Sequence, residues 1–249
     1  MSDAPLLSVV VPVYNAAAVL PQLYRQTCRV LEKAEIPFEL LFVDDASRDE
    51  SLAVLRALAQ ADARVKVVAF SRNCGQQEAT LCGIARARGR YIANMDDDLQ
   101  HPPAFLPVLL RRLCNDRLDI VYGVPAGLAG TPVRRVGGAL RDGLFFMLYG
   151  KNMRVRVSSF RVMRRALAKR VLAQRGRFNY FSAMVFARPV RAASLPYPYR
   201  AATQSHTGYS LAARVALYGG ILLHYGPLGP VIKAPPAPWP VKEVIGFGN

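Results

Sequence analysis

The segment Phe38-Glu-Leu-Leu-Phe-Val-Asp-Asp-Ala-Ser-Arg-Asp-Glu-Ser-Leu-Ala-Val-Leu-Arg-Ala-Leu58 contains the pattern of one β-strand, one loop and one α-helix. Its mostly apolar start is typical of a strand buried on both faces, and it ends at two acids, Asp44 and Asp45. Ser47 and Glu50 follow with the S-x-x-E spacing of a capping box, so we expect a helix to begin there. A strand that leads through a short polar loop into a helix predicts an α/β fold.

The same unit recurs on both sides of this segment. Further apolar runs predict strands at Leu7–Pro12, Val65–Phe70, Tyr91–Met95 and Asp119–Gly123. Helical spacing of apolar residues separates these runs at Leu20–Leu31, Gln77–Ala87 and Pro102–Cys114. This order predicts a mostly parallel central sheet with helices on both faces. Ligands of such sheets bind beyond the carboxyl ends of the strands. The polar residues at those ends are Tyr14-Asn15, Asp44-Asp45, Arg72-Asn73 and Asp96–Asp98.

The second half of the chain has a less regular pattern. The predicted elements are a helix over Val133–Leu148, a strand at Phe160–Val162, a basic helix from about Arg164, an extended segment at Pro196–Arg200 and a loose Pro-rich tail at Ala234–Pro240.

Charge is distributed unevenly between the two halves. Residues 1–119 carry 14 Lys+Arg and 15 Asp+Glu, whereas residues 120–249 carry 19 Lys+Arg and only two acids, Asp142 and Glu243. Such an excess favours an anionic partner, which could be nucleic acid, an anionic membrane surface or a phosphorylated substrate; a solvated basic surface is the alternative. Nucleic-acid modules would need aromatic residues interleaved with basic ones, a pattern that is only faint here, so we expect no nucleic-acid partner.

The cysteines and the apolar segments bear on the compartment. Cys28, Cys74, Cys82 and Cys114 form no CxxC pair and have no histidine at zinc spacing, so we expect reduced thiols and a cytoplasmic protein. The N-terminus does not have the pattern of a signal peptide. Residues 215–232 carry no formal charge, which is the lower limit for a membrane span. Glycines and prolines within them favour an interfacial segment instead.

The strongest candidate site is Asp96-Asp97-Asp98-Leu99-Gln100, which follows the fourth predicted strand. In an extended segment residues i and i+2 point the same way, so Asp96, Asp98 and Gln100 could share one cation. Oxygen ligands suit Mg²⁺ or Mn²⁺, and proteins usually hold Mg²⁺ with few carboxylates plus substrate phosphates. Such a cation would neutralise a diphosphate leaving group. A solvated acidic turn is the alternative.

The other strand ends offer nucleotide-binding groups. A carboxylate of Asp44 or Asp45 could accept from a base N–H or a ribose hydroxyl, although one of the two could instead cap the following helix. Arg72 would face a diphosphate or a base, and the alternative is a surface arginine. Neither a GxGxxG after the first strand nor a GxxxxGK[ST] is present, which disfavours dinucleotide-binding dehydrogenases and P-loop NTPases.

Four segments together resemble the motifs of family 2 glycosyltransferases: Ser8-Val-Val-Val-Pro-Val-Tyr-Asn15, Phe42-Val-Asp-Asp-Ala-Ser-Arg-Asp49, Arg72-Asn-Cys-Gly-Gln-Gln77 and Asn94-Met-Asp-Asp-Asp-Leu-Gln-His-Pro-Pro103. The last two are similar to those of polyprenyl-phosphate glycosyltransferases, the group of dolichol-phosphate mannose synthases and undecaprenyl-phosphate sugar transferases. Ser158-Ser-Phe-Arg161, Arg200 and Thr207-Gly-Tyr-Ser210 resemble the acceptor-side motifs of that group. The resemblance covers roughly Leu7 to Pro227. It implies a GT-A fold and an inverting, metal-assisted transfer from a nucleotide-sugar donor.

The resemblance also implies a role for each matching residue. The nucleotide-sugar-binding residues would be Pro12, Tyr14, Asn15, Asp44, Asp45, Arg72 and Asp97. The ligands of Mg²⁺ or Mn²⁺ would be Asp96, Asp98 and Gln100. Arg161 and Arg200 would hold the acceptor phosphate or the donor diphosphate, so the catalytic set would be Asp96, Asp98, Arg161 and Arg200. One departure is Ala16, where the family often carries an acid that contacts the nucleotide.

This resemblance suggests a division of the chain. The GT-A domain would span residues 1–210, with a donor-binding half at 1–119 and a basic acceptor half at 120–210. Residues 211–249 would form an apolar, juxtamembrane-like segment and a Pro-rich tail.

The scarcity of bases in the second half bears on the acceptor. A neutral sugar hydroxyl needs a general base within reach, but no carboxylate lies between Asp142 and Glu243. A phosphate monoester, with a second pKa of about 6, is already anionic at neutral pH and also needs cations. We therefore expect a polyprenyl phosphate acceptor. In the alternative case, Asp142, Asp97 or His101 would act as the base.

A lipid-linked acceptor implies a peripheral position on the cytoplasmic face of an anionic membrane. Since the family usually continues into transmembrane helices, a separate membrane subunit is a further expected partner. One alternative is a soluble family 2 transferase that acts on a saccharide or small-molecule acceptor in polysaccharide or cell-envelope biosynthesis. A nucleotidyltransferase is disfavoured because Pro12–Asn15 is not a Gly-rich basic loop. A catalytically inactive nucleotide-binding protein is the remaining alternative.

Overall fold

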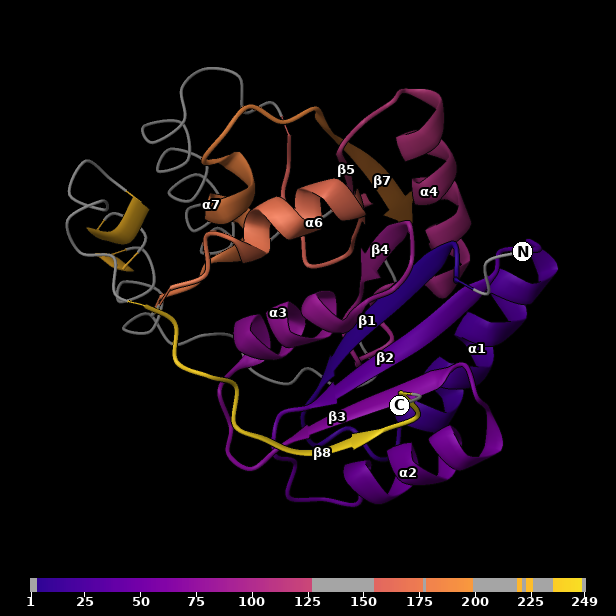
Figure 1. Cartoon of the computed structure of the whole chain (residues 1–249). Coiled ribbons are helices and arrows are strands. Elements are labelled where there is room, and N and C mark those ends of the chain that lie inside the picture. The colour runs from indigo at the N-terminus through magenta and orange to yellow at the C-terminus, as the bar shows by residue number, and fades with distance from the viewer. Residues whose placement is uncertain are drawn as a thin grey trace.

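The computed structural model describes residues 4–126, 155–176, 178–198, 219–220, 223–225 and 235–247. The strands are β1 (Leu7–Val13), β2 (Phe38–Asp44), β3 (Val65–Phe70), β4 (Tyr91–Asn94), β5 (Ile120–Ala126), β6 (Arg161–Arg164), β7 (Ala192–Pro198) and β8 (Val241–Ile245). Within the described residues they form one sheet in the order β7-β5-β6-β4-β1-β2-β3-β8 (Figure 1). β1 pairs parallel with β2 and β4, and β2 with β3, whereas β6 and β8 pair antiparallel with their neighbours. The predicted mostly parallel sheet is confirmed.

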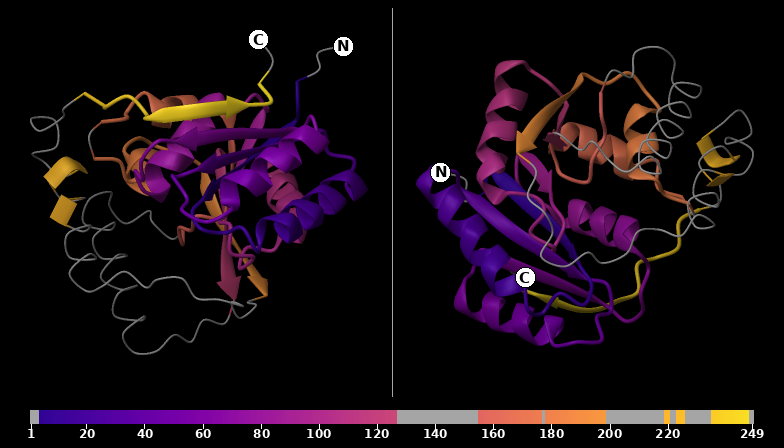
Figure 2. Two further views of the ribbon diagram at one scale, coloured as in Figure 1. Left: turned by 90° about the horizontal axis from the view of Figure 1, so that it is seen from below. Right: turned by 180° about the vertical axis from the view of Figure 1, so that it is seen from behind.

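Helices cover both faces of this sheet (Figures 1 and 2). They are α1 (Leu20–Lys33), α2 (Ser51–Ala61), α3 (Gln76–Arg86), the 3₁₀ turn η1 (Pro103–Phe105), α4 (Leu106–Asn115), α6 (Arg165–Leu172) and α7 (Phe181–Phe186). Buried residues of α1, α2 and α4 share one core with the sheet, and those of α3, α6 and α7 share another. The sheet is therefore sandwiched between two helical layers, as the alternation of strands and helices predicts.

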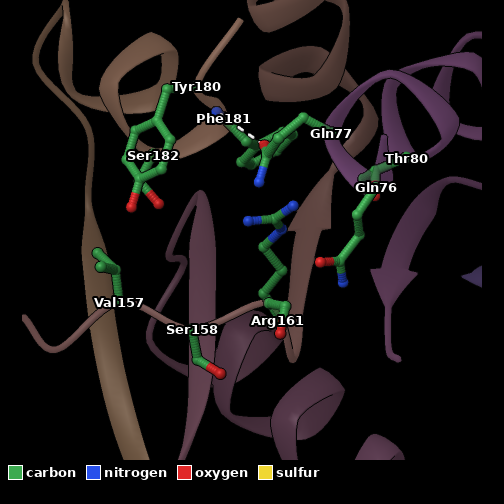
Figure 3. Close-up of a pocket in the computed structure, with 10 residues that line it drawn as sticks. Gln76, Gln77, Thr80, Val157, Ser158, Arg161, Tyr180, Phe181 and Ser182 are labelled. Carbon is green, nitrogen blue, oxygen red and sulfur yellow. Dashed lines mark hydrogen bonds between the residues drawn. The ribbon is translucent and has the colours of Figure 1, made fainter. Parts of the chain in front are cut away.

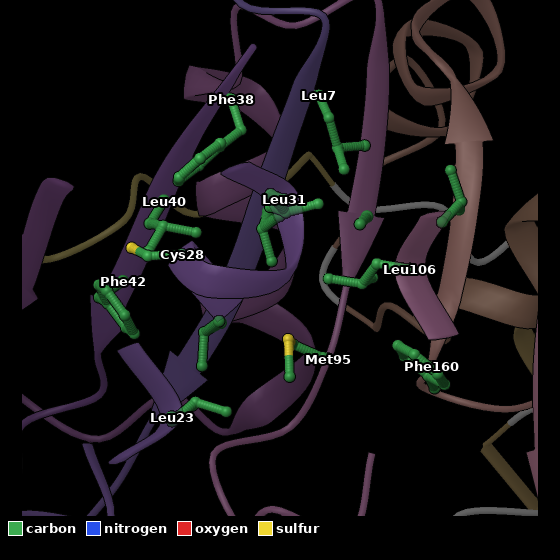
Figure 4. Packing of buried hydrophobic residues seen from close by; sticks show 14 of the residues in the cluster. Leu7, Leu23, Cys28, Leu31, Phe38, Leu40, Phe42, Met95, Leu106 and Phe160 are labelled. Carbon is green, nitrogen blue, oxygen red and sulfur yellow. The ribbon is translucent and has the colours of Figure 1, made fainter. Parts of the chain in front are cut away.

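Strand β1 shows why its sequence is apolar at every position except Ser8. Val9 and Val11 belong to the same core as Leu31 of α1, whereas Val10 belongs to the core of Ile84 on α3. Successive side chains of a strand point to opposite faces, so a strand between two helical layers needs apolar residues at nearly every position. Figure 4 shows the first of these cores, where α1 packs over β1 and β2.

Helix α3 approaches the sheet closely at Gly83. A Cβ atom added to Gly83 would overlap the side chain of Val10 on β1 and press on that of Val43 on β2. A residue without a side chain therefore permits this close packing. The spacing matters because α3 begins at Gln76, whose side chain hydrogen-bonds Asp96 beyond the end of β4.

Helix α2 begins at Ser51, four residues later than the first residue of the proposed capping box. The Ser47 hydroxyl accepts a hydrogen bond from the backbone N–H of Asn15 (3.0 Å), so it joins the loop after β1 and does not cap the helix. Asp49 Oδ1 accepts from the backbone N–H of Ser51 (3.0 Å). The predicted capping box is wrong because a contact from another loop occupies its serine.

The C-terminal segment packs against the edge of the sheet. β8 pairs antiparallel with β3, with Val67 opposite Ile245. Just before β8, the carbonyl of Pro240 accepts from the backbone N–H of Ser71 (2.8 Å). The prediction of a loose tail is therefore wrong for Ala237–Pro240, and β8 is a strand that its sequence did not indicate.

The other predictions for the second half divide into two groups. The strand at Phe160–Val162 and the helix from about Arg164 correspond to β6 and α6, and the start of the extended segment at Pro196–Arg200 lies in β7. The helix over Val133–Leu148, Arg200 and its neighbouring motif, and most of residues 215–232 lie outside the described residues. In the part of the chain that the structure describes, no helix is long and apolar enough to cross a membrane.

Candidate functional site

Loops from four parallel strands meet at one edge of the sheet. The backbone N–H of Tyr14, just after β1, donates to Asp97 Oδ2 in the loop after β4 (3.1 Å). The side-chain oxygen of Asn15 accepts from the backbone N–H of Arg48 in the loop after β2 (2.8 Å). Asn15 adopts a left-handed φ of 54°, which asparagine tolerates better than most residues. The fold thus brings residues of distant predicted motifs together at the ligand edge.

Asp45 ties the loop after β2 to the loop after β3. Its two carboxylate oxygens accept from the backbone N–H groups of Cys74 (2.6 Å) and Gly75 (2.7 Å). The side chain of Asn73 donates to the backbone carbonyl of Asp45 (3.2 Å). Burial raises the pKa of Asp45, while the two amide donors act in the opposite direction. The carboxylate therefore fixes the backbone at residues 74 and 75, and Asn73 adds a contact to the backbone of Asp45.

The other predicted nucleotide residues differ in exposure. Asp44 is buried, which raises the pKa of its carboxyl, and both of its oxygens lie 3.4 Å from the backbone nitrogen of Ser47. Pro12 is buried within β1. Tyr14 is 44% exposed, and Arg72 is exposed at the end of β3, so both side chains are open to a ligand.

Asp96 is the best connected residue of the acidic triplet. Its Oδ1 accepts from Gln76 Nε2 at the start of α3 (2.6 Å), and its Oδ2 accepts from Ser159 Oγ just before β6 (2.7 Å). Its backbone N–H donates to Nδ1 of His101 (3.0 Å), whose buried ring stacks on Phe160 with 4.9 Å between centroids. Two separate segments therefore fix the orientation of this carboxylate, and His101 holds the backbone beneath it.

The backbone of the triplet differs from the prediction. β4 ends at Asn94, and the chain bends at residues 97–99, where Leu99 has a left-handed φ of 61°. The assumption of an extended segment is therefore wrong. Asp98 Oδ1 accepts from the backbone N–H of Gln100 (3.0 Å). Burial, together with the neighbouring charges of Asp96 and Asp98, raises the pKa of Asp97 to about 6.

The groups available to a metal ion are all oxygens. In the described residues, no three His, Cys, Asp or Glu side chains lie close enough to form a metal site by themselves. Asp96 and Asp98 are half-buried and lie in one loop with Gln100, whose side chain carries an amide oxygen. This donor set fits a hard cation that is held by few carboxylates and completed by substrate phosphates and water, as Mg²⁺ usually is.

A pocket of about 170 Å³ opens beside Asp96, between α3, the start of β6 and α7 (Figure 3). Its lining consists of Gln76, Gln77, Thr80, Val157, Ser158, Ser159, Arg161, Tyr180, Phe181 and Ser182. The guanidinium of Arg161 points into this pocket toward Gln77 and Phe181 (Figure 3). The lining contains one cation and neither a carboxylate nor an imidazole.

Arg161 is buried without a counter-charge among the described residues. It is 5% exposed, its Nε donates to Asn94 Oδ1 (3.2 Å), and its guanidinium lies over the ring of Phe181 at 3.4 Å. No described carboxylate lies within ion-pair distance, and burial lowers its pKa to about 10. Arg161 stays protonated at neutral pH, and although the charge of Asp96 acts on it from a distance, no described carboxylate pairs with it, so the pocket has a positive charge that favours an anionic ligand.

Several residues of the site were not predicted. Gln76 and Ser159 lie within the segments that carried the resemblance, but no role was assigned to them. Phe181 had no signal at all. Their contacts with Asp96 and Arg161 span 20 to 63 positions in sequence. A pattern of local spacing cannot reveal such contacts. Arg200, predicted to act with Arg161, lies outside the described residues.

Comparison with known proteins places this site in context. Residues 8–172 match the family described as Glycosyl transferase family 2. An undecaprenyl-phosphate 4-deoxy-4-formamido-L-arabinose transferase of Pseudomonas paraeruginosa is 36% identical over 189 residues, which cover 74% of this chain and 55% of the relative. A protein of the same name from Sodalis glossinidius is 33% identical over 185 residues, covering 73% and 56%. This chain thus spans about half the length of these curated relatives.

The fold is similar to that of glucosyl-3-phosphoglycerate synthase from Mycobacterium tuberculosis, solved in complex with Mn²⁺, uridine diphosphate and phosphoglyceric acid. The TM-score is 0.64 at 19% identity, over 89% of this chain and 79% of the other. At this identity the likeness shows the fold alone, and it confirms the predicted GT-A fold. With the family match over most of the sequence, the chain belongs to glycosyl transferase family 2.

Proposed function

We propose that this protein transfers a sugar from a nucleoside-diphosphate sugar to a polyprenyl phosphate, with inversion at the anomeric carbon and with Mg²⁺ or Mn²⁺. By their names, the two relatives act on undecaprenyl phosphate, and the solved synthase binds uridine diphosphate together with Mn²⁺. Because the chain spans about half the length of those relatives, the support has to come from the site as well.

The observation that carries the proposal is the composition of the pocket beside Asp96. Its lining presents the buried guanidinium of Arg161 and no carboxylate or imidazole. A sugar hydroxyl bound there would have no lining group to remove its proton. A phosphate monoester needs no base, and it would neutralise the guanidinium with charge-assisted hydrogen bonds.

The strand order would place the donor and the acceptor on opposite sides of Asp96. In the order β6-β4-β1-β2-β3, Arg161 lies on the β6 side of Asp96, while Asp44, Asp45 and Arg72 lie on the β2 and β3 side. A donor whose nucleoside contacts Asp44, Asp45 and Arg72 would extend its diphosphate toward Asp96. Its sugar would then lie toward the Arg161 pocket. Pro12, Tyr14, Asn15 and Asp97 would complete the donor site.

The reaction needs few protein groups. A phosphate oxygen of the acceptor attacks the anomeric carbon, and the bond from that carbon to the donor diphosphate breaks. The attacking oxygen is already ionised, so no proton has to move. Arg161 orients the acceptor phosphate. A divalent cation bound by Asp96, Asp98 and Gln100 would offset the negative charge of the departing diphosphate.

The test compares two acceptors that differ only by the phosphate. Purified full-length protein is incubated with labelled UDP- and GDP-sugars and with vesicles that contain either undecaprenyl phosphate or undecaprenol. We expect label in the lipid fraction with the phosphate alone, and we expect its loss on addition of EDTA. Transfer only to oligosaccharide or to water would contradict the proposal.

A second candidate is transfer to the hydroxyl of a saccharide or small molecule, which Asp97 favours. The pKa of Asp97 is raised to about 6, which is suited to a general base near neutral pH. A general base contributes about 100- to 10,000-fold to rate, so Asp97→Asn would lose that much with a hydroxyl acceptor. A much smaller loss with polyprenyl phosphate would exclude this role.

We also propose a peripheral position on an anionic membrane surface, supported by the 19 Lys and Arg residues among positions 120–249. Cosedimentation with phosphatidylglycerol vesicles should occur at low salt and be reversed by high salt. Equal binding to neutral phosphatidylcholine vesicles would contradict it. A separate membrane subunit stays a prediction.

A further inference from the structure

The segment Ala237–Gly246, here called the C-terminal clasp, crosses the edge of the sheet next to the donor side of the site (Figures 1 and 2). It contains β8, which pairs with β3. The Lys66 amine donates to the backbone carbonyls of Ala63 (2.8 Å) and of Gly246, near the end of the clasp. The clasp begins far beyond the residues that match the family.

One anchor of the clasp is a charged cluster around Glu78, in the first turn of α3. Trp239 Nε1 donates to Glu78 Oε2 (2.9 Å), and the same oxygen accepts from Arg175 (2.8 Å). Arg175 also donates to the carbonyl of Ala237 (2.7 Å), and its guanidinium lies over the ring of Trp239 at 4.0 Å. Asn179 Nδ2 donates to Glu78 Oε1 (2.5 Å). Trp239 is therefore held by a hydrogen bond to a carboxylate and by a cation–π contact.

A second anchor holds the end of β3. The carbonyl of Pro240 accepts from both the backbone N–H (2.8 Å) and the hydroxyl (3.2 Å) of Ser71. Trp239 and Pro240 are adjacent, so the clasp grips Ser71 and Glu78 from neighbouring positions. The two anchors bracket residues 72–77.

The bracketed residues carry much of the predicted donor site. Arg72 is exposed at the end of β3, and the N–H groups of Cys74 and Gly75 hold the carboxylate of Asp45. Gln76 holds Asp96. Gly75 has a φ of 86°, a left-handed conformation in which glycine is free of strain. A short loop with such a turn is held in one shape by its two ends.

We propose that Trp239 is a positioning residue for donor binding: through Glu78 and Ser71, the C-terminal clasp fixes the loop at residues 72–76 in the shape that receives the nucleoside diphosphate. This inference rests on the proposed function for the identity of the ligand. The role is positioning because the contacts of Trp239 are all with the protein: its polar and cation–π partners are Glu78, Arg175 and Arg86, and its ring packs against the apolar core between α3 and the sheet.

The experiment compares Trp239→Phe, Trp239→Leu and the control Glu243→Gln. Phenylalanine keeps a ring for Arg175 but removes the N–H that donates to Glu78, whereas leucine removes both. Glu243→Gln weakens a different contact of the clasp: the partly exposed ion pair between Glu243 on β8 and Arg56 on α2 (2.6 Å). Binding of UDP and GDP with Mn²⁺ is measured by isothermal titration calorimetry, and KM for the donor and kcat are measured separately.

We expect Trp239→Phe to raise the nucleotide Kd and the donor KM about 5-fold, and Trp239→Leu about 30-fold, because hydrogen bonds to charged groups are among the stronger ones. kcat at saturating donor should change less than about 2-fold, since the residues at the reacting centre are intact. Glu243→Gln should bind nucleotide like the wild type. If the phenylalanine variant keeps part of the nucleotide binding, Trp239 acts by positioning the loop, since a clasp detached from the sheet would lose binding equally in both variants. Thermal unfolding without ligand checks that each variant is folded.

The two proposals fail in different ways. If the wild type binds no nucleoside diphosphate, the proposed function fails. If it binds one and the folded Trp239 variants bind it equally well, the donor site stands and the positioning role of Trp239 is overturned. A fall in kcat without a change in Kd or KM would also overturn it.

Discussion

Arg64 and Arg161 each place a guanidinium over a phenylalanine ring, but the two regions differ in what neutralises the charge. Arg64, just before β3, lies 4.6 Å from the ring of Phe38 and pairs with Asp62 (2.8 Å) and Glu32 (2.7 Å). Hydrogen bonds that Arg64 donates to Asp62 raise the pKa of Arg64, whereas burial lowers that of Arg161 to about 10.

The difference distinguishes Arg64, whose charge stabilises the fold, from Arg161, whose charge is available to a ligand in the pocket. The fold supplies the partners of Arg64 itself, so this charge is satisfied without a ligand. Arg161 faces a pocket of neutral side chains, and among the described residues it forms no ion pair: it donates to Asn94, lies over the Phe181 ring and feels the charge of Asp96 from beyond ion-pair distance. An arginine that is buried without an ion pair reduces stability, which is the reason for our proposal that Arg161 receives an anionic group of the substrate.

The largest expected effect is at Asp98, in the same loop as Asp96. Asp98→Asn removes a carboxylate that is predicted to bind the metal, and loss of one such electrostatic group typically lowers kcat about 100- to 1,000-fold. Steady-state turnover with saturating donor measures it. The control is Asp116→Asn, which breaks a surface pair with Arg112 (2.8 Å) and should leave turnover unchanged. Equal turnover of the Asp98 variant and the wild type would show that this region is not the reacting centre.

The second effect separates function from stability at Arg161. Arg161→Met keeps most of the volume but removes the buried charge, so we expect kcat/KM for polyprenyl phosphate to fall about 100-fold, equivalent to about 2.7 kcal/mol. The melting temperature of the ligand-free protein should stay the same or rise, because an uncompensated charge is removed. Donor binding, measured by calorimetry, should change little. A lower melting temperature with normal acceptor use would make Arg161 a scaffold residue like Arg64.

The third effect is a pH dependence of the free energy of unfolding, caused by the ion pair between Asp62 and Arg64. The Arg64 hydrogen bonds lower the pKa of Asp62 to about 2 from an ordinary value near 4. The stability from this shift is present above pH 4 and is lost as the pH falls toward 2. Asp62→Asn should therefore cost about 2 kcal/mol at pH 7 and less at pH 3, by urea unfolding at both pH values. A difference between the two proteins that is the same at pH 7 and pH 3 would mean that the ionised pair is not its source.

The smallest effect is at Arg64 itself. Its side chain is 39% exposed, so solvent weakens its ion pairs and Arg64→Met should cost only about 1 kcal/mol. That corresponds to a fall in melting temperature of about 2–4 °C for a chain of this size. Activity should stay within about 2-fold of the wild type, because exposed sites far from the chemistry rarely matter to it. A large loss of activity would remove the contrast with Arg161.

Strands buried on both faces were predictable because their sequences are almost continuously apolar. Residues 65–70 became β3 with the predicted bounds. β8 was not predictable in the same way. Its sequence Val241-Lys-Glu-Val-Ile245 follows a Pro-rich run, and it is an edge strand whose side chains are partly exposed. An edge strand depends on its partner for pairing, and its own sequence gives little sign of it.

The candidate site shows the same limit. The acids of the site were predicted because they sit where strands end, and that position depends only on local pattern. The groups that orient them were not, because Gln76, Ser159 and His101 reach Asp96 through three-dimensional contacts. Ser47 was assigned to a helix cap for the same reason: the backbone N–H that occupies its hydroxyl instead belongs to Asn15, in the loop after β1.

The close packing of α3 on the sheet has a consequence for any attempt to engineer this enzyme. Gly83 and Gln76 are seven residues apart, about 10 Å along a helix. A single methyl group at position 83 would push the middle of α3 away from the sheet and shift its N-terminal end, where Gln76 contacts Asp96. Substitutions at Leu81 or Ile84 can replace one buried side chain by another of similar volume. Position 83 has no side chain to replace and no room for one. Variants at position 83 would displace Gln76 and so disturb its hydrogen bond to Asp96.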